Sequence, residues 1–212
     1  MIVETWMTKQ PLVVAPETTI GEAAAAMMKG GFRHLPVVRD GVLLGIISRS
    51  DLLRGREIDP FAAGNRESTA LRTEIQHVMT ASPVTVAPTT PLEEAAALLV
   101  ARKIGALPVV RENGLLVGIL TESDAMRALI ESIEMPGPGV RLTFDTTKPD
   151  ALIAFLVDHA AKLHLHIVSL MVRHVSGGIE VLVKVRGAQG DKLVDAAWGA
   201  GHRLRNVTRG HP

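Results

Sequence analysis

An internal repeat constrains this 212-residue chain more than any other feature. Two sequence motifs recur 72 positions later (from 7 to 79 and from 35 to 107), and a third motif recurs 73 positions later (from 45 to 118). A fixed displacement over several motifs predicts two copies of one structural unit. One copy is too small to cover both faces of its own sheet, so the two copies should pack together. The repeated pairs are Met7–Pro16 with Met79–Pro88, Leu35–Val38 with Leu107–Val110, and Gly45–Asp51 with Gly118–Asp124.

Each copy predicts the same series of elements. A β segment, Leu12–Ala15 or Val84–Ala87, leads to an Ala-rich helix. We expect a threonine hydroxyl to cap each helix, from Thr18 or Thr19 in the first copy and from Thr90 in the second. A buried Leu-Pro-Val-Val strand, a turn and a second strand follow, and another helix begins near the final Asp.

Three features of each copy resemble the CBS domain: a Met-Thr opening, a Leu-Pro-Val-Val strand, and the closing pattern Gly-x-x-[Ser/Thr]-x-x-Asp. Two such units in tandem resemble a Bateman module, over roughly residues 1–130. With its C-terminal part included, the chain is similar to the family of acetoin-utilisation accessory proteins. The resemblance implies an α/β fold of β-α-β-β-α units, with copies at 1–54 and 76–130 joined by a connecting segment at 55–75.

The resemblance also implies a regulatory adenosine-containing ligand, such as AMP, ADP, ATP or S-adenosylmethionine. Asp51 and Asp124 would take the ribose hydroxyls, and Ser48 and Thr121 would meet phosphate. The chemistry agrees, because a carboxylate can accept from both hydroxyls of a cis-diol and a helix N-terminus offers free N–H groups to phosphate. The same four residues also satisfy a helix capping box, which needs no ligand. Both roles can coexist.

The copies differ just before the Leu-Pro strand, where the first has Arg33-His34 and the second has Gly105-Ala106. The two small residues would let a flat adenine approach the backbone closely. Arg and His carry donors suited to phosphate. In paired CBS domains the copies face each other across a cleft, so the resemblance suggests that Arg33 and His34 reach the phosphates of a ligand whose ribose lies on Asp124. The alternative is that Arg33 is a solvated surface residue.

The C-terminal part predicts a separate domain. Residues 131–139, with Pro136–Gly139, are typical of a linker. Residues 140–208 predict the ferredoxin-like order βαββαβ, which is similar to ACT domains. We expect a capping box at Thr147–Asp150 to start the first helix. Because 145–148 lacks the Gly-rich turn of amino-acid-binding ACT domains, we expect this domain to pair subunits.

Histidines gather in this half of the chain. On one strand, His164 and His166 would share a face, which permits a metal pair. Because no Cys or paired carboxylate completes a ligand shell, we expect no metal.

Composition and the absence of certain motifs limit which classes of partner and function we expect. Aromatic residues make up 3% and the net charge is +1, which argues against nucleic acid. The absence of cysteine, signal peptide and long apolar run predicts a cytoplasmic protein without a membrane partner. The chain shows no phosphate-loop or nucleophile-elbow motif, so we expect no enzyme. We expect a homodimer or larger assembly that regulates an unidentified protein partner. The alternative is a structural dimerisation protein with vestigial ligand sites.

Overall fold

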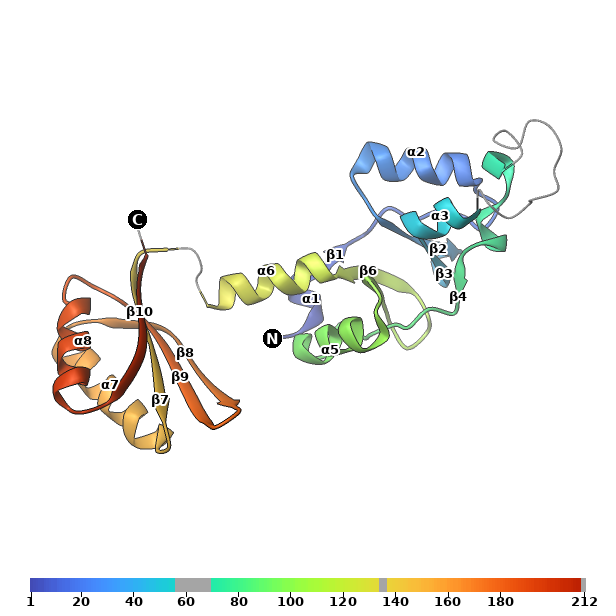
Figure 1. Cartoon of the computed structure of the whole chain (residues 1–212). Helices are drawn as coiled ribbons and strands as arrows, with labels where there is room; N and C mark the ends of the chain where they lie inside the picture. Colours follow the sequence, from blue (N-terminus) through green and yellow to red (C-terminus); the bar gives the residue numbers. More distant parts are fainter. Residues whose placement is uncertain (56–69, 134–136, 211–212) are drawn as a thin grey trace. The chain divides into compact units, whose positions relative to one another are not determined.

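The chain divides into two compact units, Met1–Met126 and Arg127–Pro212 (Figure 1). The computed structural model describes residues 1–55, 70–133 and 137–210. Most of the predicted connecting segment 55–75, and part of the predicted linker including Pro136, lie outside the described residues. Within the described ranges, no helix is long and apolar enough to cross a membrane.

The first repeat is built on a helix and a hairpin. After the short α1 (Val3–Trp6) and β1 (Thr8–Lys9), α2 (Ile20–Gly30) packs on the hairpin of β2 (His34–Arg39) and β3 (Val42–Ser48), and α3 (Arg49–Gly55) follows. Ile20, Ala23 and Met27 recur at helical spacing and are buried against the strands. Thr19 caps α2 in a reciprocal capping box with Glu22, which confirms the predicted cap.

The second repeat has the same elements in the same order. A single 3-10 turn, η1 (Ile75–His77), leads to β4 (Thr80–Ala81). The remaining elements are α5 (Leu92–Arg102), the hairpin of β5 (Ala106–Val110) and β6 (Leu116–Thr121), and α6 (Glu122–Ser132). The predicted pair of repeated units is therefore confirmed.

The two repeats exchange their opening strands. β1 of the first repeat pairs with β6 of the second, and β4 of the second pairs with β3 of the first, so the sheets run β1-β6-β5 and β2-β3-β4. The methionines next to the exchanged strands explain why two positions in the sheets are glycine. A methyl group on Gly118 would collide with the sulfur of Met7, and one on Gly45 would collide with that of Met79. The Met-Thr opening of each copy is thus built into the sheet of the other copy.

Two sequence predictions about the repeats are wrong. Leu12–Ala15 and Val84–Ala87 are not strands; each makes a single parallel bridge, at Val14 and Val86. Prolines flank both segments and donate no N–H, so the ladder cannot extend. Thr90 is not a helix cap, because Pro91 occupies the cap position of α5. The Thr90 hydroxyl instead accepts the Ala87 N–H at 3.0 Å and closes the preceding turn.

The C-terminal unit has the predicted order βαββαβ. Its elements are β7 (Gly139–Thr146), α7 (Pro149–Lys162), β8 (His166–Val175), β9 (Gly178–Arg186), α8 (Gly190–Gly199) and β10 (Arg203–Gly210). The antiparallel sheet runs β10-β7-β9-β8, which is the ferredoxin-like arrangement. Both helices lie on one face of this sheet, over a core that includes Phe144, Leu152 and Leu193 (Figure 1).

Two predictions for this unit are also wrong. Thr147 does not cap α7, because the helix begins at Pro149 and Lys148 is its cap residue, without a side-chain cap. A proline is well suited to the first helical position, and here it fixes the helix start one residue later than predicted. His164 has a φ of 51° and lies before β8, so it does not share a strand face with His166. Among the described residues, no three His, Cys, Asp or Glu side chains form a potential metal site.

Candidate functional site

A cavity of about 300 Å³ lies between the two repeats of the N-terminal unit. We call it the Asp124 cavity. The structure brings together four of the predicted binding residues here, with Arg33 and His34 from the first repeat and Thr121 and Asp124 from the second. The strand exchange positions them, because β1 pairs with β6 and so holds the first repeat's opening beside Thr121. The other lining residues are Thr8, Gln10, Pro11, Leu12, Gly31, Phe32, Leu35, Ile119 and Ser123.

Asp124 caps α6 while it lines the cavity. It is only 4% exposed, and its Oδ2 accepts from the Thr121 N–H at 2.9 Å and from the Thr121 hydroxyl at 2.6 Å. The Thr121 hydroxyl accepts in turn from the Asp124 N–H at 3.3 Å. The residues Thr121 and Asp124 therefore do form a capping box at the start of α6. It does not exclude ligand binding, because a carboxylate carries about four acceptor positions.

Asp51 makes the equivalent cap in the first repeat. Its Oδ2 accepts from the Ser48 N–H at 2.8 Å and from the Ser48 hydroxyl at 2.6 Å. Its Oδ1 forms an ion pair with Arg54. Neither Asp51 nor Ser48 lines the Asp124 cavity.

Arg33 is exposed, yet it crosses between the repeats. Its carbonyl accepts the Arg49 N–H at 2.9 Å, which fixes the backbone beside α3. Its guanidinium donates to the Ser123 hydroxyl of the second repeat at 3.5 Å, which is a long hydrogen bond. The exposed guanidinium agrees with the surface interpretation, and it also lies at the wall of the Asp124 cavity. Its contact with phosphate stays a prediction.

His34 is half-buried at the start of β2. Burial lowers the pKa of its imidazole below the ordinary value of 6.5, and the positive charge of Arg33 lowers it further. The carboxylates of Asp51 and Glu122 act in the opposite direction. The imidazole is therefore neutral at pH 7 in the unliganded chain.

Gly105 and Ala106 do not line the Asp124 cavity. The space in front of Gly105 is taken by the imidazole of His34: a methyl group on Gly105 would lie 2.9 Å from its Cε1 and 3.1 Å from its Nε2. The expected open approach for adenine at Gly105 is thus filled by a side chain of the other repeat.

Sequence reasoning missed part of the cavity wall. Thr8, Gln10, Pro11 and Leu12 belong to the Met-Thr opening and the bend after it. The repetition of this opening in both copies was a signal that it has a shared role. What the sequence could not reveal is that each opening serves the other copy's sheet.

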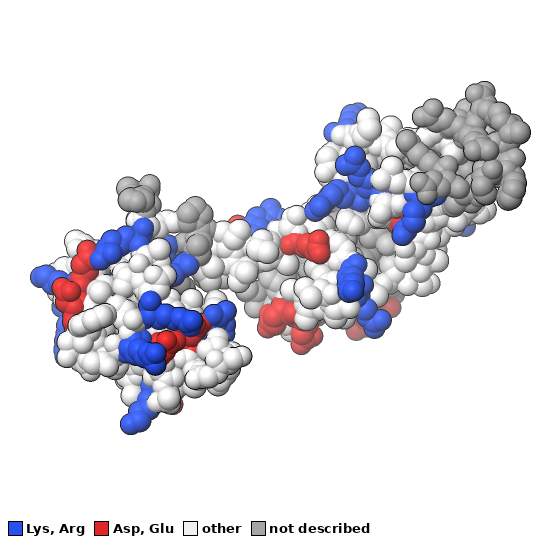
Figure 2. Space-filling model, viewed as in Figure 1, with Lys and Arg blue, Asp and Glu red and all other residues white. Residues whose placement is uncertain are grey.

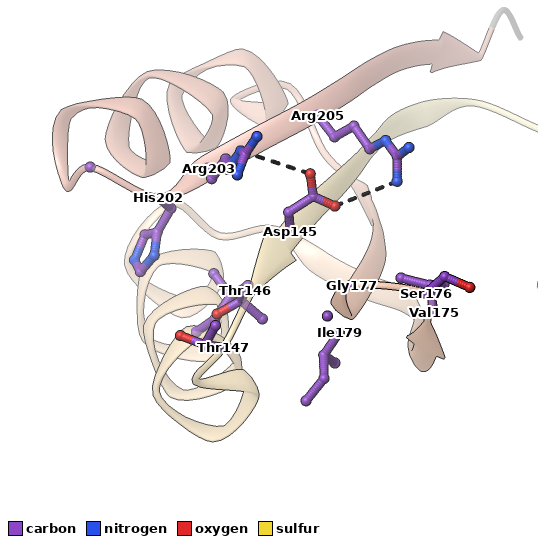
Figure 3. Close-up of a pocket in the computed structure, with 13 residues that line it drawn as sticks. Asp145, Thr146, Thr147, Val175, Ser176, Gly177, Ile179, His202, Arg203 and Arg205 are labelled. Atoms are coloured by element: carbon purple, nitrogen blue, oxygen red, sulfur yellow. Dashed lines mark ion pairs between the residues drawn. The ribbon is translucent and has the colours of Figure 1, made fainter.

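A larger cavity, about 520 Å³, lies at one end of the C-terminal unit (Figure 3). It is formed where β7 meets α7, at the β8–β9 turn, and where α8 meets β10. Asp145 stands between two arginines there, with Arg203 Nε at 3.9 Å and Arg205 Nη1 at 3.5 Å. Figure 2 shows positive and negative side chains side by side on this unit. None of the predicted binding residues lies in this cavity.

The N-terminal unit has clear relatives. The profile of the CBS domain family matches residues 3–57 and 75–131. The chain belongs to the CBS domain family. An uncharacterized protein of Methanocaldococcus jannaschii is 34% identical over 131 residues, which cover 59% of this chain and 46% of that protein. The chain thus spans about half the length of this relative.

Solved structures of CBS pairs are similar to the N-terminal unit. CBSX2 of Arabidopsis thaliana, solved in complex with AMP, is 33% identical with a TM-score of 0.54, covering 61% of this chain and 96% of that one. A Vibrio cholerae protein described as the acetoin utilization protein AcuB is 35% identical with a TM-score of 0.56, covering 64% and 94%. The CBS pair of protein MJ0100, solved with 5′-methylthioadenosine and S-adenosylmethionine, is 26% identical with a TM-score of 0.53, covering 61% and 95%.

Proposed function

We propose that this chain is a regulatory sensor that binds a phosphorylated adenosine ligand in the Asp124 cavity. One observation carries the proposal: a ribose-type carboxylate, Asp124, and two phosphate-type donors, Arg33 and His34, come from different repeats and line one cavity. A volume of about 300 Å³ is at the small end of the range for ligand sites.

The cavity offers an acceptor for the ribose of the ligand and hydrogen-bond donors for its phosphate. The Asp124 carboxylate would accept from the ribose hydroxyls, in addition to its cap bonds. The phosphate would lie toward Arg33 and Ser123, where the guanidinium can exchange its 3.5 Å hydrogen bond for a charge-assisted one. The second repeat would thus hold the sugar, and both repeats would hold the phosphate.

Charge selects among the adenosine ligands. The solved relatives contain AMP in one case and 5′-methylthioadenosine with S-adenosylmethionine in another. A sulfonium brings positive charge toward the Arg33 guanidinium and is disfavoured by like-charge repulsion. We therefore place AMP, ADP and ATP ahead of S-adenosylmethionine for this cavity.

We further propose that the C-terminal unit is ACT-like and pairs with a second copy along β8. This strand ends the sheet, so one of its edges has no strand partner in the described part of the unit. On the face that carries the helices, Ile167, Leu170 and Val172 oppose buried valines of β9, yet they are 36–41% exposed. A long edge with apolar side chains is suited to pairing with another strand.

The dimer is tested by light scattering on Leu170→Lys. A lysine at an exposed edge disfavours strand pairing. We expect wild type to exceed the 22.7 kDa monomer mass at micromolar concentration, and Leu170→Lys to shift toward it. Val157→Lys, on the exposed side of α7, is the matched control and should not change the mass. A wild-type mass that stays at the monomer value would contradict the proposed dimer.

A purely structural role is the second candidate. The specific observation in its favour is that the Asp51 and Asp124 carboxylates accept hydrogen bonds from Ser48 and Thr121 in capping boxes, a role that is structural in itself. In neither case do we assign the chain a reaction. A thermal-shift panel of AMP, ADP, ATP, S-adenosylmethionine and adenosine separates the two, because a ligand that binds only the folded state raises the unfolding midpoint. A flat response to all five compounds would favour the structural role.

A further inference from the structure

The cavity of about 520 Å³ in the C-terminal unit has a charged side and an apolar side (Figure 3). We call it the Arg203 cavity. Its volume lies within the range of small-molecule sites. The charged side chains in its lining are Asp145, Arg203 and Arg205, and the aliphatic ones are Leu152, Val175 and Ile179. A cavity with both kinds of wall suits a small organic ion.

The arginines at the charged side outnumber their carboxylate partners. Glu180, on the neighbouring strand β9, forms ion pairs with Arg173 and Arg205. Hydrogen bonds from Arg173 lower the pKa of Glu180, so this carboxylate is ionised at neutral pH. Asp145 lies between Arg203 and Arg205 (Figure 3). These three guanidinium groups and two carboxylates leave one positive charge unbalanced.

Arg203 is the arginine that this cluster holds least firmly. Its Nε lies 3.9 Å from Asp145 Oδ2, which is too long for a hydrogen bond, and its side chain is 84% exposed. Arg205, in contrast, pairs with both Asp145 and Glu180. The guanidinium of Arg203 can therefore turn toward an incoming anion without breaking a hydrogen bond to Asp145.

The charges at the cavity select a carboxylate. A guanidinium binds a carboxylate or a phosphate through paired N–H donors. One unbalanced positive charge matches a monocarboxylate, whereas a phosphate dianion would bring a second negative charge toward Asp145. Among the described residues that line the cavity, Asp145 is the one acidic side chain, and two arginines already share it. An ammonium group would therefore meet a positive wall, which disfavours zwitterions such as amino acids.

We propose that the Arg203 cavity binds a small monocarboxylate that has a hydrocarbon chain and no ammonium group. Arg203 holds the carboxylate, and the hydrocarbon chain lies against Val175 and Ile179. Leu152, which is 1% exposed, belongs to the same apolar side. This site shares no residue with the Asp124 cavity, so its ligand is independent of the proposed adenosine binding.

The test is an NMR titration of the isotope-labelled full chain with three compounds of matched shape. Isocaproate is leucine without its ammonium group, and isohexanol replaces the carboxylate of isocaproate with a neutral alcohol. We expect isocaproate to bind about tenfold tighter than leucine or isohexanol, because it alone offers Arg203 a carboxylate without adding a positive charge. Shifts of the Gly177 and Gly201 amide signals, from residues that line the cavity, locate the binding.

Two substitutions should change the affinity in opposite directions. Arg203→Gln removes the guanidinium and should weaken isocaproate binding about tenfold. Asp145→Asn removes the carboxylate that competes for Arg203 and repels the ligand, so isocaproate binding should tighten a few-fold. A purely structural role of Asp145 would not produce tighter binding. Arg209→Gln is the matched control, because Arg209 lies on the same strand but pairs with Asp191 outside the cavity.

Circular dichroism first checks that each variant is folded. If leucine or isohexanol bound as tightly as isocaproate, the proposed ligand class would be wrong. Unchanged affinity in folded Arg203→Gln, or an equal loss in Arg209→Gln, would show that Arg203 does not hold the carboxylate. If none of the three compounds shifts the amide signals of the cavity, the site itself is wrong.

Discussion

In the first repeat, Arg33 precedes the strand beside the Asp124 cavity and His34 begins that strand; in the second repeat, Gly105 and Ala106 hold these positions. The residues around these two positions have equivalent roles in the two repeats. Each has a buried Leu-Pro-Val-Val strand, a Met-Thr opening on the other's sheet and an aspartate that caps the following helix. Packing therefore fixes the shared residues, whereas the position before the strand and the first position of the strand differ in chemistry between the repeats.

The largest expected difference between the repeats lies in their aspartates. Asp124→Ala should weaken AMP binding by about 1.5–3 kcal/mol, or roughly 10- to 150-fold, because it removes hydrogen bonds to a charged group. Asp51→Ala is the matched control, since it removes an equivalent cap outside the cavity. Calorimetry measures both affinities, and circular dichroism checks both folds. Equal affinities in the two folded variants would assign Asp124 to capping alone.

Arg33→Gly makes the first repeat resemble the second at this position. We expect about tenfold weaker AMP binding, from the loss of one charge-assisted hydrogen bond. Binding of adenosine should change little, since adenosine lacks the phosphate. Arg39→Gly, which removes an arginine paired with Glu17 outside the cavity, is the control. An equal loss for AMP and adenosine would show that Arg33 supports the fold and not the phosphate.

The pH dependence of AMP binding tests His34, which the second repeat replaces with Ala106. In the free chain the pKa of His34 is below 6.5, so the imidazole is neutral at pH 8 and pH 7. A bound phosphate favours the protonated form and raises this pKa. Binding then takes up protons, and affinity should rise a few-fold as the pH falls from about 8 toward 6.

His34→Gln is the control for that experiment, because the phosphate of AMP also titrates near neutral pH. The difference between wild type and His34→Gln isolates the imidazole. If the two pH profiles coincide, His34 does not meet the phosphate.

The smallest effect is expected from removing the C-terminal unit. A chain that ends at Ile133 keeps α6 whole and retains every residue that lines the Asp124 cavity. We expect AMP affinity within about twofold of the full chain, because the two units are separate compact bodies. A severe loss of affinity in a folded, truncated chain would place part of the site beyond residue 133.

Sequence patterns predicted the architecture well, because repeats and hydrophobic periodicity are recorded in the chain itself. The Leu-Pro-Val-Val strands and the alternating Val181, Val183 and Val185 all lie where their patterns indicate. The caps at Thr90 and Thr147 failed, since in each case a proline set the helix start. In both cases the threonine and the proline offered competing start signals, and the position of the proline fixed the start of the helix.

The candidate site was less predictable than the fold. The meeting of Arg33 and His34 with Thr121 and Asp124 followed from family resemblance. The imidazole of His34 over Gly105 could not be foreseen, because it depends on which way one side chain turns across a boundary between repeats. Nothing in the sequence around Gly105 indicates a neighbour 71 positions earlier.

The exchange of opening strands has a consequence for how the two copies came to depend on each other. Taken alone, one copy would present a sheet edge that lacks its third strand and an opening with no sheet to join. Two separate molecules could satisfy both needs only by trading openings, which is domain swapping. The present chain performs that trade within itself, so it is in effect a dimer joined by a peptide linker. Joining the copies freed them from identical sequences, and one gene product can carry an arginine and a histidine in one half where the other half has two small residues.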